Sequence, residues 1–278
     1  MRRAPRASFV IVAASLMAVA TSCGGEPEAG VPTFAATVPL PWVDPARCLT
    51  SCAHTVEPDL VTVDATARPA ADGTFQVRRE AQPALVALFA AAARASFAVS
   101  IGDAHRTYDQ QAMLWDQLSV SEPGRAARPG HSEHEAGLAF DLDFASSDAA
   151  TAWTVDHAWQ YGFVLSYPQH KQKTTGFRFE PWHFRFVGSA VAADLHDHPD
   201  LTLEEWFRMS PGLGVSGDCS DCPLPSSRSD CGALTAAGQC DASVLTWCFD
   251  GAVTAVDCTT SGLVCAVDTA GTSADCGP

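Results

Sequence analysis

The sequence predicts a folded body of mixed helices and strands followed by a small disulfide-rich domain, and three observations support this division. Segments with helical patterns recur between residues 80 and 161. Apolar and polar residues alternate between the second and third of these segments, as in a strand with one buried face. Eight of the eleven cysteines lie between Cys219 and Cys276, where large apolar residues are few. Disulfide bridges would there replace a hydrophobic core.

Local signals define the predicted helices. The expected helices are 80–97, 108–118, 147–161 and a short one from 202 through 207. In the first, apolar residues recur at helical spacing, and Pro83 suits the first turn because that position needs no N–H. Gly162 is a residue type that ends helices, so the third should end at Tyr161. Thr202 and Glu205 have the spacing of a capping box, which opens the last helix.

Two strands are predicted in the same body. In 137–144, Phe140 and other apolar residues alternate with Asp141 and other small or acidic residues, so one face of this strand should be buried. The segment 176–187 is dense in aromatic residues, which also favours a strand. Pro181 cannot donate a hydrogen bond to a neighbouring strand, so we expect a break there.

Composition and charge exclude several classes of protein. Hydrophobic residues make up 47% of the chain and charged residues 18%, a balance that intrinsically disordered chains do not have. The formal net charge of -15 would repel phosphate backbones, so nucleic acid is not an expected partner. No apolar stretch reaches the length of about 18 residues that spans a bilayer, so a channel or transporter is not expected.

The N-terminus has the features of an export signal over residues 1–22. A basic start is followed by an apolar stretch over 8–20 and then by small residues. The exit resembles a bacterial lipoprotein cleavage box, in which Cys23 would carry the lipid, although Ala20 stands where leucine is usual. We therefore expect an exported protein that is either anchored in the cell envelope through Cys23 or secreted. A lipid on this cysteine would attach the protein to a membrane.

The remaining chain divides by composition. The predicted order is a signal peptide (1–22), a flexible tether (23–41), the body (42–209), a linker (210–217) and a disulfide-rich module (218–278). Cysteines of an exported protein meet oxidising conditions, so Cys48 and Cys52 should form one local bridge. The eight cysteines of the module should form four bridges, whose pairing stays open because eight cysteines allow 105 arrangements. A zinc ribbon that begins with Cys219 and Cys222 is the alternative.

Two segments of the body concentrate side chains that bind metals and transfer protons. The first contains His134, just before the predicted strand, and Asp141 on its polar face; the second contains Glu180 and His183. A hydrolytic zinc site needs three nitrogen or oxygen ligands and a fourth position for water. His134, Asp141 and His183 fill that need. Glu180 lies three residues before His183, close enough to take a proton from the water.

Three motifs follow one another in the body. They are His105-Arg106-Thr107-Tyr108-x-x-Gln111, Ser132-x-His134-x-x-Gly137-x-Ala139-x-Asp141 and Glu180-x-Trp182-His183-x-Arg185. Together they resemble the successive motifs of VanY-type D-alanyl-D-alanine carboxypeptidases, and the resemblance covers about residues 80 to 208. It implies an α+β fold, with a small antiparallel sheet and flanking helices. It also implies a peptidase that holds one zinc ion in its catalytic domain and acts on peptidoglycan stem peptides.

The resemblance implies a role for each matching residue. His134, Asp141 and His183 would bind the zinc ion. Glu180 would be the general base and later the acid. Arg106 would stabilise the oxygen of the scissile carbonyl group, which agrees with the chemistry of a guanidinium aimed at an oxyanion.

Ser132 and Gln111 match positions that line the peptide pocket in such enzymes. The alternatives are that Ser132 is a plain loop or cap residue and Gln111 a helix-surface amide. Arg106 could likewise be a solvated cation paired with a nearby aspartate. Two residues depart from the family pattern: Ser166 stands where the family often has arginine, and His105 where it often has tyrosine. Both departures bear on which substrate is bound.

The sequence therefore predicts an exported, zinc-dependent D-alanyl-D-alanine carboxypeptidase that hydrolyses the terminal peptide bond of stem peptides. Two alternatives stay open within the same fold, an endopeptidase and an L,D-carboxypeptidase, each of which would cut another bond of the same substrate. A third is a cell-wall-binding protein that keeps the metal as a scaffold without catalysis. The intact Glu180 argues against the third.

Overall fold

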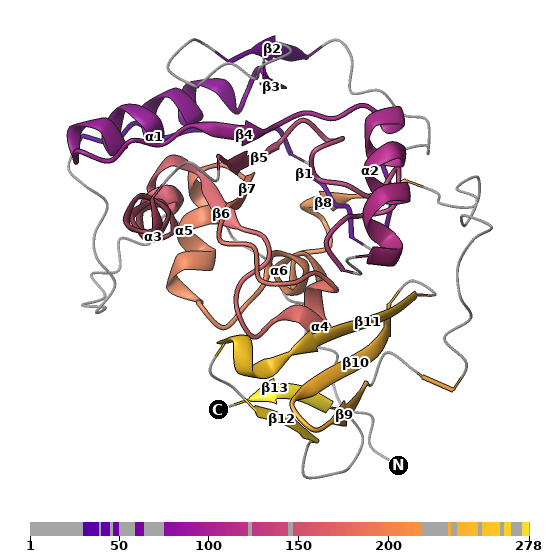
Figure 1. The fold of residues 1–278 in the computed structure, drawn as a ribbon. Helices are drawn as coiled ribbons and strands as arrows, with labels where there is room; N and C mark the ends of the chain where they lie inside the picture. The colour runs from indigo at the N-terminus through magenta and orange to yellow at the C-terminus, as the bar shows by residue number, and fades with distance from the viewer. Residues whose placement is uncertain are drawn as a thin grey trace, which may run out of the picture.

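A computed structural model places most of the chain, and its helices and strands form a mixed body and a smaller C-terminal region of strands (Figure 1). The residues that the structure describes are 30–38, 40–44, 47–49, 59–63, 75–121, 124–143, 147–217, 233–234, 238–249, 252–261, 264–267 and 274–277. We call the described residues up to 217 the body and those from 233 onward the C-terminal region. The predicted α+β class is confirmed.

A four-stranded antiparallel sheet lies at the centre of the body. Its strands, in spatial order, are β4 (Ile101–Asp103), β5 (Ala139–Leu142), β7 (His183–Phe186) and β6 (Phe163–Leu165). The register pairs Asp141 of β5 with His183 of β7. Because directly opposed residues point to the same face of a sheet, these two side chains project side by side.

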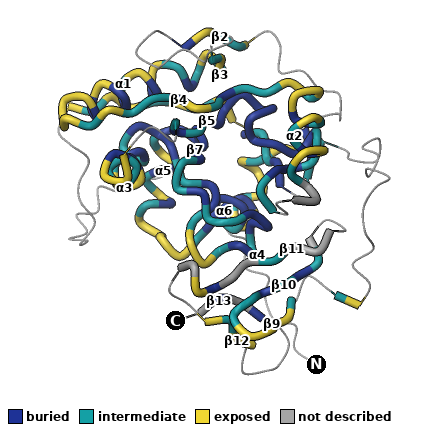
Figure 2. The backbone as a smooth tube through the Cα atoms, viewed as in Figure 1, coloured by how far each residue is buried: buried dark blue, intermediate teal, exposed yellow. Residues whose placement is uncertain are grey.

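The opposite face of the sheet carries the aromatic core. Phe140 alternates with Asp141 along β5, so its ring points away from the polar face. The ring stacks on Phe184 at 5.5 Å and meets Phe89 and Phe163 edge to face at 5.8 Å and 5.2 Å between centroids. Phe89 belongs to helix α1 (Gln82–Arg94), which therefore covers this face. Figure 2 shows how deeply the backbone around β5 and β7 is buried.

The other helices lie around this sheet (Figure 1). They are α2 (Tyr108–Ser121), α3 (Asp148–His157), the 3-10 helix η1 (Ala158–Tyr161), α4 (Gln172–Thr175), α5 (Ser189–Asp197) and α6 (Leu203–Met209). The predicted end at Gly162 is confirmed, because this glycine adopts the left-handed conformation after η1. The predicted capping box is also confirmed, since Thr202 and Glu205 exchange both of its hydrogen bonds.

The strand predicted over 176–187 is shorter than expected. Only His183–Phe186 pairs with neighbouring strands, and the chain before it forms turns and loop structure. Pro181 explains where the pairing begins, because a strand cannot donate through this residue. Two short strands, β4 and β6, had no periodic signal to reveal them.

Parts of the segments predicted as tether and linker contribute to the body. Strand β1 (Leu40–Pro41) pairs in parallel with β8 (Gly214–Val215), and Leu40 is fully buried. Phe34 packs against the main core, and its backbone exchanges hydrogen bonds with Ser189. A second small sheet, β2 (Leu60–Thr62) with β3 (Gln76–Arg78), lies beside α1 in Figure 1.

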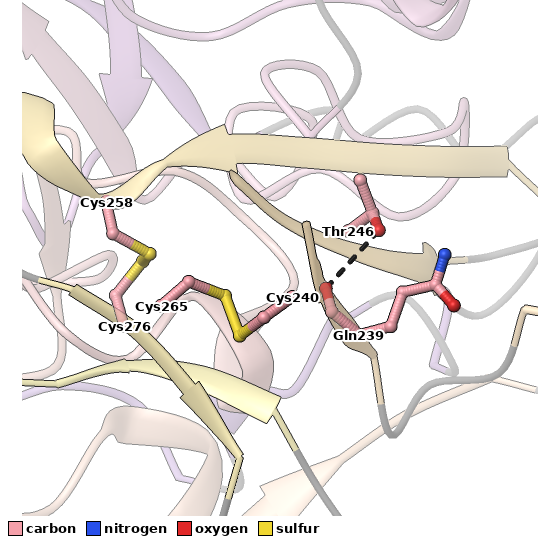
Figure 3. The surroundings of a disulfide bond; sticks show 6 residues. All are labelled: Gln239, Cys240, Thr246, Cys258, Cys265 and Cys276. Carbon is pink, nitrogen blue, oxygen red and sulfur yellow. Dashed lines mark hydrogen bonds between the residues drawn. A yellow bond between two sulfur atoms is a disulfide. The ribbon is translucent and has the colours of Figure 1, made fainter. Parts of the chain in front are cut away.

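The C-terminal region consists of strands and one 3-10 helix. Its elements are β9 (Gln239–Asp241), β10 (Val244–Phe249), β11 (Ala252–Asp257), η3 (Cys258–Ser261), β12 (Val264–Val267) and β13 (Ala274–Gly277). Disulfides join Cys240 to Cys265 and Cys258 to Cys276 (Figure 3). Both pairs lie in the module predicted to be disulfide-rich.

Other predictions about cysteines reach beyond the described residues. Cys48 and Cys248 are also disulfide-bonded. The predicted lipid site Cys23, the predicted bridge partner Cys52 and the proposed zinc-ribbon pair Cys219 and Cys222 lie outside the described residues, as does the predicted signal peptide. Within the described ranges, every helix is too short or too polar to cross a bilayer.

Candidate active site

Three side chains predicted to bind metal converge at the polar face of the central sheet. His134 Nε2 lies 3.2 Å from His183 Nδ1 and 3.3 Å from Asp141 Oδ1, and His183 Nδ1 lies 2.9 Å from the same oxygen. Zinc bonds of about 2.0–2.2 Å place two ligands of a tetrahedron about 3.3–3.5 Å apart. The three atoms therefore form a triangle close in size to one face of a zinc coordination sphere, and the structure brings together the group that the sequence suggested.

Local backbone structure places each of these side chains. A tight turn after Ser132 carries His134. The carbonyl oxygen of His134 accepts a hydrogen bond from the Gly137 N–H. Gly137 has a φ of 68°, and a side chain there would meet Leu60 at 3.0 Å, so the turn requires glycine. Strand β5 begins two residues later and presents Asp141, and the register with β7 adds His183.

The donor set suits a divalent cation. Asp141 Oδ1 is buried and lies within 3.3 Å of a nitrogen of each of the two ligand histidines. Burial alone would raise the pKa of Asp141, but the charges and hydrogen bonds of His134 and His183 hold it below its ordinary value. An ionised carboxylate and two imidazole nitrogens directed at one point are the ligand types that zinc binds.

Each imidazole is held from behind by a second partner. His134 Nδ1 lies 2.6 Å from the carbonyl oxygen of Ala104, and His183 Nε2 lies 2.9 Å from Glu133 Oε2. The ring of Tyr167 stacks on His183 at 4.6 Å between centroids. Sequence reasoning missed Glu133, although the sequence offered one signal: an acid directly before a predicted ligand histidine.

A cavity of about 300 Å³ opens over this triangle. Its lining includes the three predicted ligands, Glu180, Arg106, Ser132, Arg125, Tyr167 and Trp182. Burial raises the pKa of Glu180 to about 8, and the negative charge of Asp141 adds to this, while His183, Arg125 and Arg106 oppose it. A carboxyl group with a pKa near neutrality can both accept and return a proton at physiological pH.

The structure places the other predicted residues as follows. Arg106 lines the cavity and donates a hydrogen bond from Nη1 to Asp103 Oδ2 at 2.8 Å. Arg106 therefore pairs with an aspartate, as in the alternative interpretation, and also lines the cavity, as its predicted role requires. Ser132 lines the cavity, and its Oγ accepts a hydrogen bond from the His134 N–H. Gln111 is fully buried and donates to the carbonyl oxygen of Ala127, which forms part of the cavity wall.

The two residues that depart from the family motifs were expected to bear on substrate binding, but neither lines the cavity. Ser166 is fully buried and does not belong to the cavity lining; its hydroxyl donates a hydrogen bond to Glu133 Oε2 at 2.5 Å. It therefore contacts a partner of His183 and lies behind the site. His105 is also absent from the cavity lining. Arg125, which the sequence did not single out, lies on the cavity wall instead.

Comparisons with known proteins agree with this geometry. Residues 74–189 match the family described as VanY, D-alanyl-D-alanine carboxypeptidase. The chain is 37% identical over 146 residues to the protein YodJ of Bacillus subtilis, covering 47% of this chain and 53% of that protein. It is 34% identical over 111 residues to the D-alanyl-D-alanine carboxypeptidase of Enterococcus faecium, covering 38% of this chain and 35% of that protein.

A solved structure also resembles the body. The LdcB LD-carboxypeptidase shares 32% identity with a TM-score of 0.53, and the likeness covers 60% of this chain and 84% of that one. A sheet that presents three metal-ligand side chains beside a buried glutamate is the arrangement of a hydrolytic metal site. Through its body, the chain belongs to the VanY D-alanyl-D-alanine carboxypeptidase family. It spans 53% and 35% of the lengths of the two curated relatives named above.

Proposed function

We propose that this protein is an exported zinc-dependent carboxypeptidase that removes the terminal D-alanine from peptidoglycan stem peptides ending in D-alanyl-D-alanine. One observation carries the proposal. His134, Asp141 and His183 converge on one point, and Glu180 lines the same cavity. The E. faecium relative is named for this activity, and the matching family carries the same description.

The chain's own residues divide the chemistry between them. Held by His134, Asp141 and His183, zinc would supply Lewis acidity toward a water molecule and the scissile carbonyl oxygen. Glu180 accepts the proton that the attacking water loses and returns it to the departing amine of D-alanine. Arg106 faces the same cavity and stabilises the negative charge that develops on the carbonyl oxygen.

The size and charge of the cavity suit the end of a short peptide. About 300 Å³ lies at the lower limit of ligand pockets, which favours a terminal dipeptide over a longer chain passing through. The guanidinium groups of Arg106 and Arg125 are both in its lining. A free C-terminal carboxylate is the substrate group that such cations attract most strongly, and a carboxypeptidase must recognise that group.

The test is product analysis with the purified protein. Zinc-loaded protein is incubated with a pentapeptide stem that ends in D-alanyl-D-alanine, and released D-alanine is measured. We expect one D-alanine per peptide, and a fall of 10²-fold to 10⁴-fold in Glu180→Gln, as is typical when a general base is removed. The variant must bind zinc and unfold as the parent does. Equal rates in parent and Glu180→Gln would leave a metal-containing binding protein as the better interpretation.

The same assay separates the two alternative activities. LdcB is named as an LD-carboxypeptidase, so a tetrapeptide that lacks the last D-alanine is the matched second substrate. Release of D-alanine from the tetrapeptide but not the pentapeptide would assign an L,D-carboxypeptidase. Cleavage inside the stem would assign an endopeptidase.

Export is part of the proposal and rests on the N-terminal sequence. The predicted signal over 1–22 would direct the enzyme to the cell envelope, where its proposed substrate lies, and a lipid on Cys23 would anchor it. Fractionation of cells that express the parent and Cys23→Ala tests this. We expect the parent in the membrane fraction and the variant released; recovery of both in the cytoplasm would refute export.

A further inference from the structure

Behind His183 lies a buried polar cluster that the proposed reaction does not use. It consists of Glu133, Ser166 and Arg185, whose exposed fractions are 5%, 0% and 0%. Ionised side chains are rarely buried to this degree unless they are paired. The partners of these side chains therefore indicate what the cluster does.

The cluster touches the metal site through one side chain. Glu133 Oε2 lies 2.9 Å from His183 Nε2, while His183 Nδ1 lies 2.9 Å from Asp141 Oδ1 on the other side of the ring. A carboxylate only accepts hydrogen bonds, so Nε2 must carry the hydrogen. The remaining nitrogen, Nδ1, then has a free lone pair directed at His134 and Asp141, which is the form that binds a metal.

One hydrogen bond and one buried positive charge act on the Glu133 carboxylate. Ser166 Oγ donates to the same Oε2 atom at 2.5 Å. Arg185 follows His183 by two residues on β7, so its side chain projects from the same face of the sheet. Its Nη2 donates to the carbonyl oxygen of Pro41 at 2.7 Å, and its Nε donates to that of Phe186 at 3.3 Å. The guanidinium is thereby fixed as the buried counter-charge.

The two histidines of the site are held by different kinds of partner. The group behind His134 is the neutral carbonyl oxygen of Ala104, whereas the group behind His183 is a carboxylate. Both fix a tautomer and a ring orientation, but the carboxylate also increases the electron density on the ligand nitrogen. His183 should therefore contribute more to metal affinity than His134, and that difference should depend on Glu133.

We propose that Glu133 is a positioning residue that fixes the metal-binding tautomer of His183 and raises metal affinity, that Ser166 holds its carboxylate there, and that the buried charge of Arg185 favours the ionised form of that carboxylate. This rests on the metal site of the proposed function and is independent of which peptide bond is cut. It also gives Ser166 a role: the serine supports the site from behind and does not select the substrate.

The test measures zinc binding directly, so it does not require hydrolysis. Zinc affinity of the full chain is determined by competition with a chromophoric chelator for the parent, Glu133→Gln, Glu133→Ala and Ser166→Ala. Loss of such an outer partner commonly costs about 10-fold to 100-fold in metal affinity. We expect Glu133→Ala at the upper end, Glu133→Gln at the lower end because its carbonyl oxygen still accepts from Nε2, and a few-fold loss in Ser166→Ala.

A control and a second measurement separate positioning from simple loss of stability. Glu205→Gln also removes a carboxylate from the body, but the partners of this glutamate are Lys171 and Thr202, so its zinc affinity should equal that of the parent. Nitrogen NMR of the zinc-loaded protein should report His183 with its hydrogen on Nε2 and the metal on Nδ1 in the parent, and a second population with the two nitrogens exchanged in Glu133→Ala. If Glu133→Ala fails to fold, Glu133→Gln and Ser166→Ala decide. Parent-like affinity and tautomer in those two folded variants would overturn the proposal.

Discussion

The body and the C-terminal region reach a folded state by different means. Within the described residues, every buried charged side chain belongs to the body, where an aromatic core surrounds the central sheet. The C-terminal region buries only Leu245, Trp247, Ala274 and two cysteines, and it is crosslinked by two described disulfides. Burying a charge costs several kcal/mol, so a large apolar core is what allows the body to hold its metal site. A region with a small core and covalent crosslinks lacks the apolar burial that would offset this cost.

The largest effect is expected from damage to the aromatic core of the body. Phe140 is 1% exposed and contacts the rings of Phe89, Phe163 and Phe184. Phe140→Ala should lower the free energy of unfolding of the body by about 3–5 kcal/mol, because it creates a cavity at the centre of this cluster. Urea unfolding followed by circular dichroism measures the change.

The matched control for this substitution lies on the same side of the sheet. Val86 of α1 is 36% exposed, and Val86→Ala should change the free energy of unfolding by less than about 0.5–1 kcal/mol. The two described disulfides of the C-terminal region should stay intact in Phe140→Ala. A loss below about 1 kcal/mol would show that the core is not what stabilises the body.

The second prediction concerns the covalent bond that stabilises the C-terminal region. The double substitution of Cys258 and Cys276 by serine opens a link between residues 18 positions apart. Loss of such a crosslink costs about 3 kcal/mol in the chain-entropy account, which should make this region sensitive to limited proteolysis. On the proposed function, hydrolysis by the body should stay at the parent rate. A large fall in that rate would show that the two regions depend on each other.

The third prediction uses two neighbouring glutamates of α6. Burial raises the pKa of Glu204 to about 8, and its Oε2 has no hydrogen-bond partner among the described residues. An acid whose pKa is raised on folding binds more protons in the folded state, so it lowers stability as pH rises from about 4.5 to 8. Glu204→Gln should therefore be more stable than the parent by about 2–3 kcal/mol at pH 7 and nearly equal to it at pH 4.

Glu205, on the same helix, should change stability with pH in the opposite direction. Partial burial opposes the shift, but the Thr202 backbone N–H and the Lys171 ammonium lower the pKa of Glu205 below its ordinary value. Its ionised form is favoured by folding, so Glu205→Gln should lose about 1 kcal/mol at neutral pH, and that loss should disappear as pH falls below the unfolded pKa. Thermal unfolding of both variants from pH 4 to pH 8 measures the contrast. Parallel curves for the two variants would contradict it.

Sequence reasoning succeeded where a short local pattern determines the structure. Gly162 ends η1, and Thr202 with Glu205 opens α6, because each signal acts within one helical turn. His134, Asp141 and His183 could be grouped because residue type and motif order restrict the chemistry of a metal site. Their actual meeting depends on the pairing of β5 with β7.

The rest depended on contacts between segments far apart in the chain. Glu133 contacts His183 at a separation of 50 residues, and its place directly before His134 does not tell which histidine it would contact. Leu40 pairs with Gly214, so the end of a segment read as tether becomes a buried strand. Strands of three residues, such as β4, are too short for an alternating pattern to identify them.

The smallest expected effect on stability comes from a charge that faces the cavity, in contrast to the charges that are buried in the body. Arg125 lies on the cavity wall, where its positive charge lowers the pKa of Glu180, and it is only partly buried. Arg125→Ala should therefore leave the free energy of unfolding within about 0.5 kcal/mol of the parent. On the proposed function, it should raise KM for a peptide with a free carboxyl end by about 10-fold, since a charged hydrogen bond contributes about 1.5–3 kcal/mol.

A second substrate and a conservative variant test whether the carboxylate is the group recognised. The parent should discriminate against a pentapeptide whose C-terminus is amidated, and Arg125→Ala should lose most of that discrimination. Arg125→Lys keeps the charge without the planar fork of donors, so it should recover part of the affinity. If kcat fell in Arg125→Ala while KM stayed constant, the guanidinium would act on the transition state together with Arg106, because an interaction made only there lowers kcat alone.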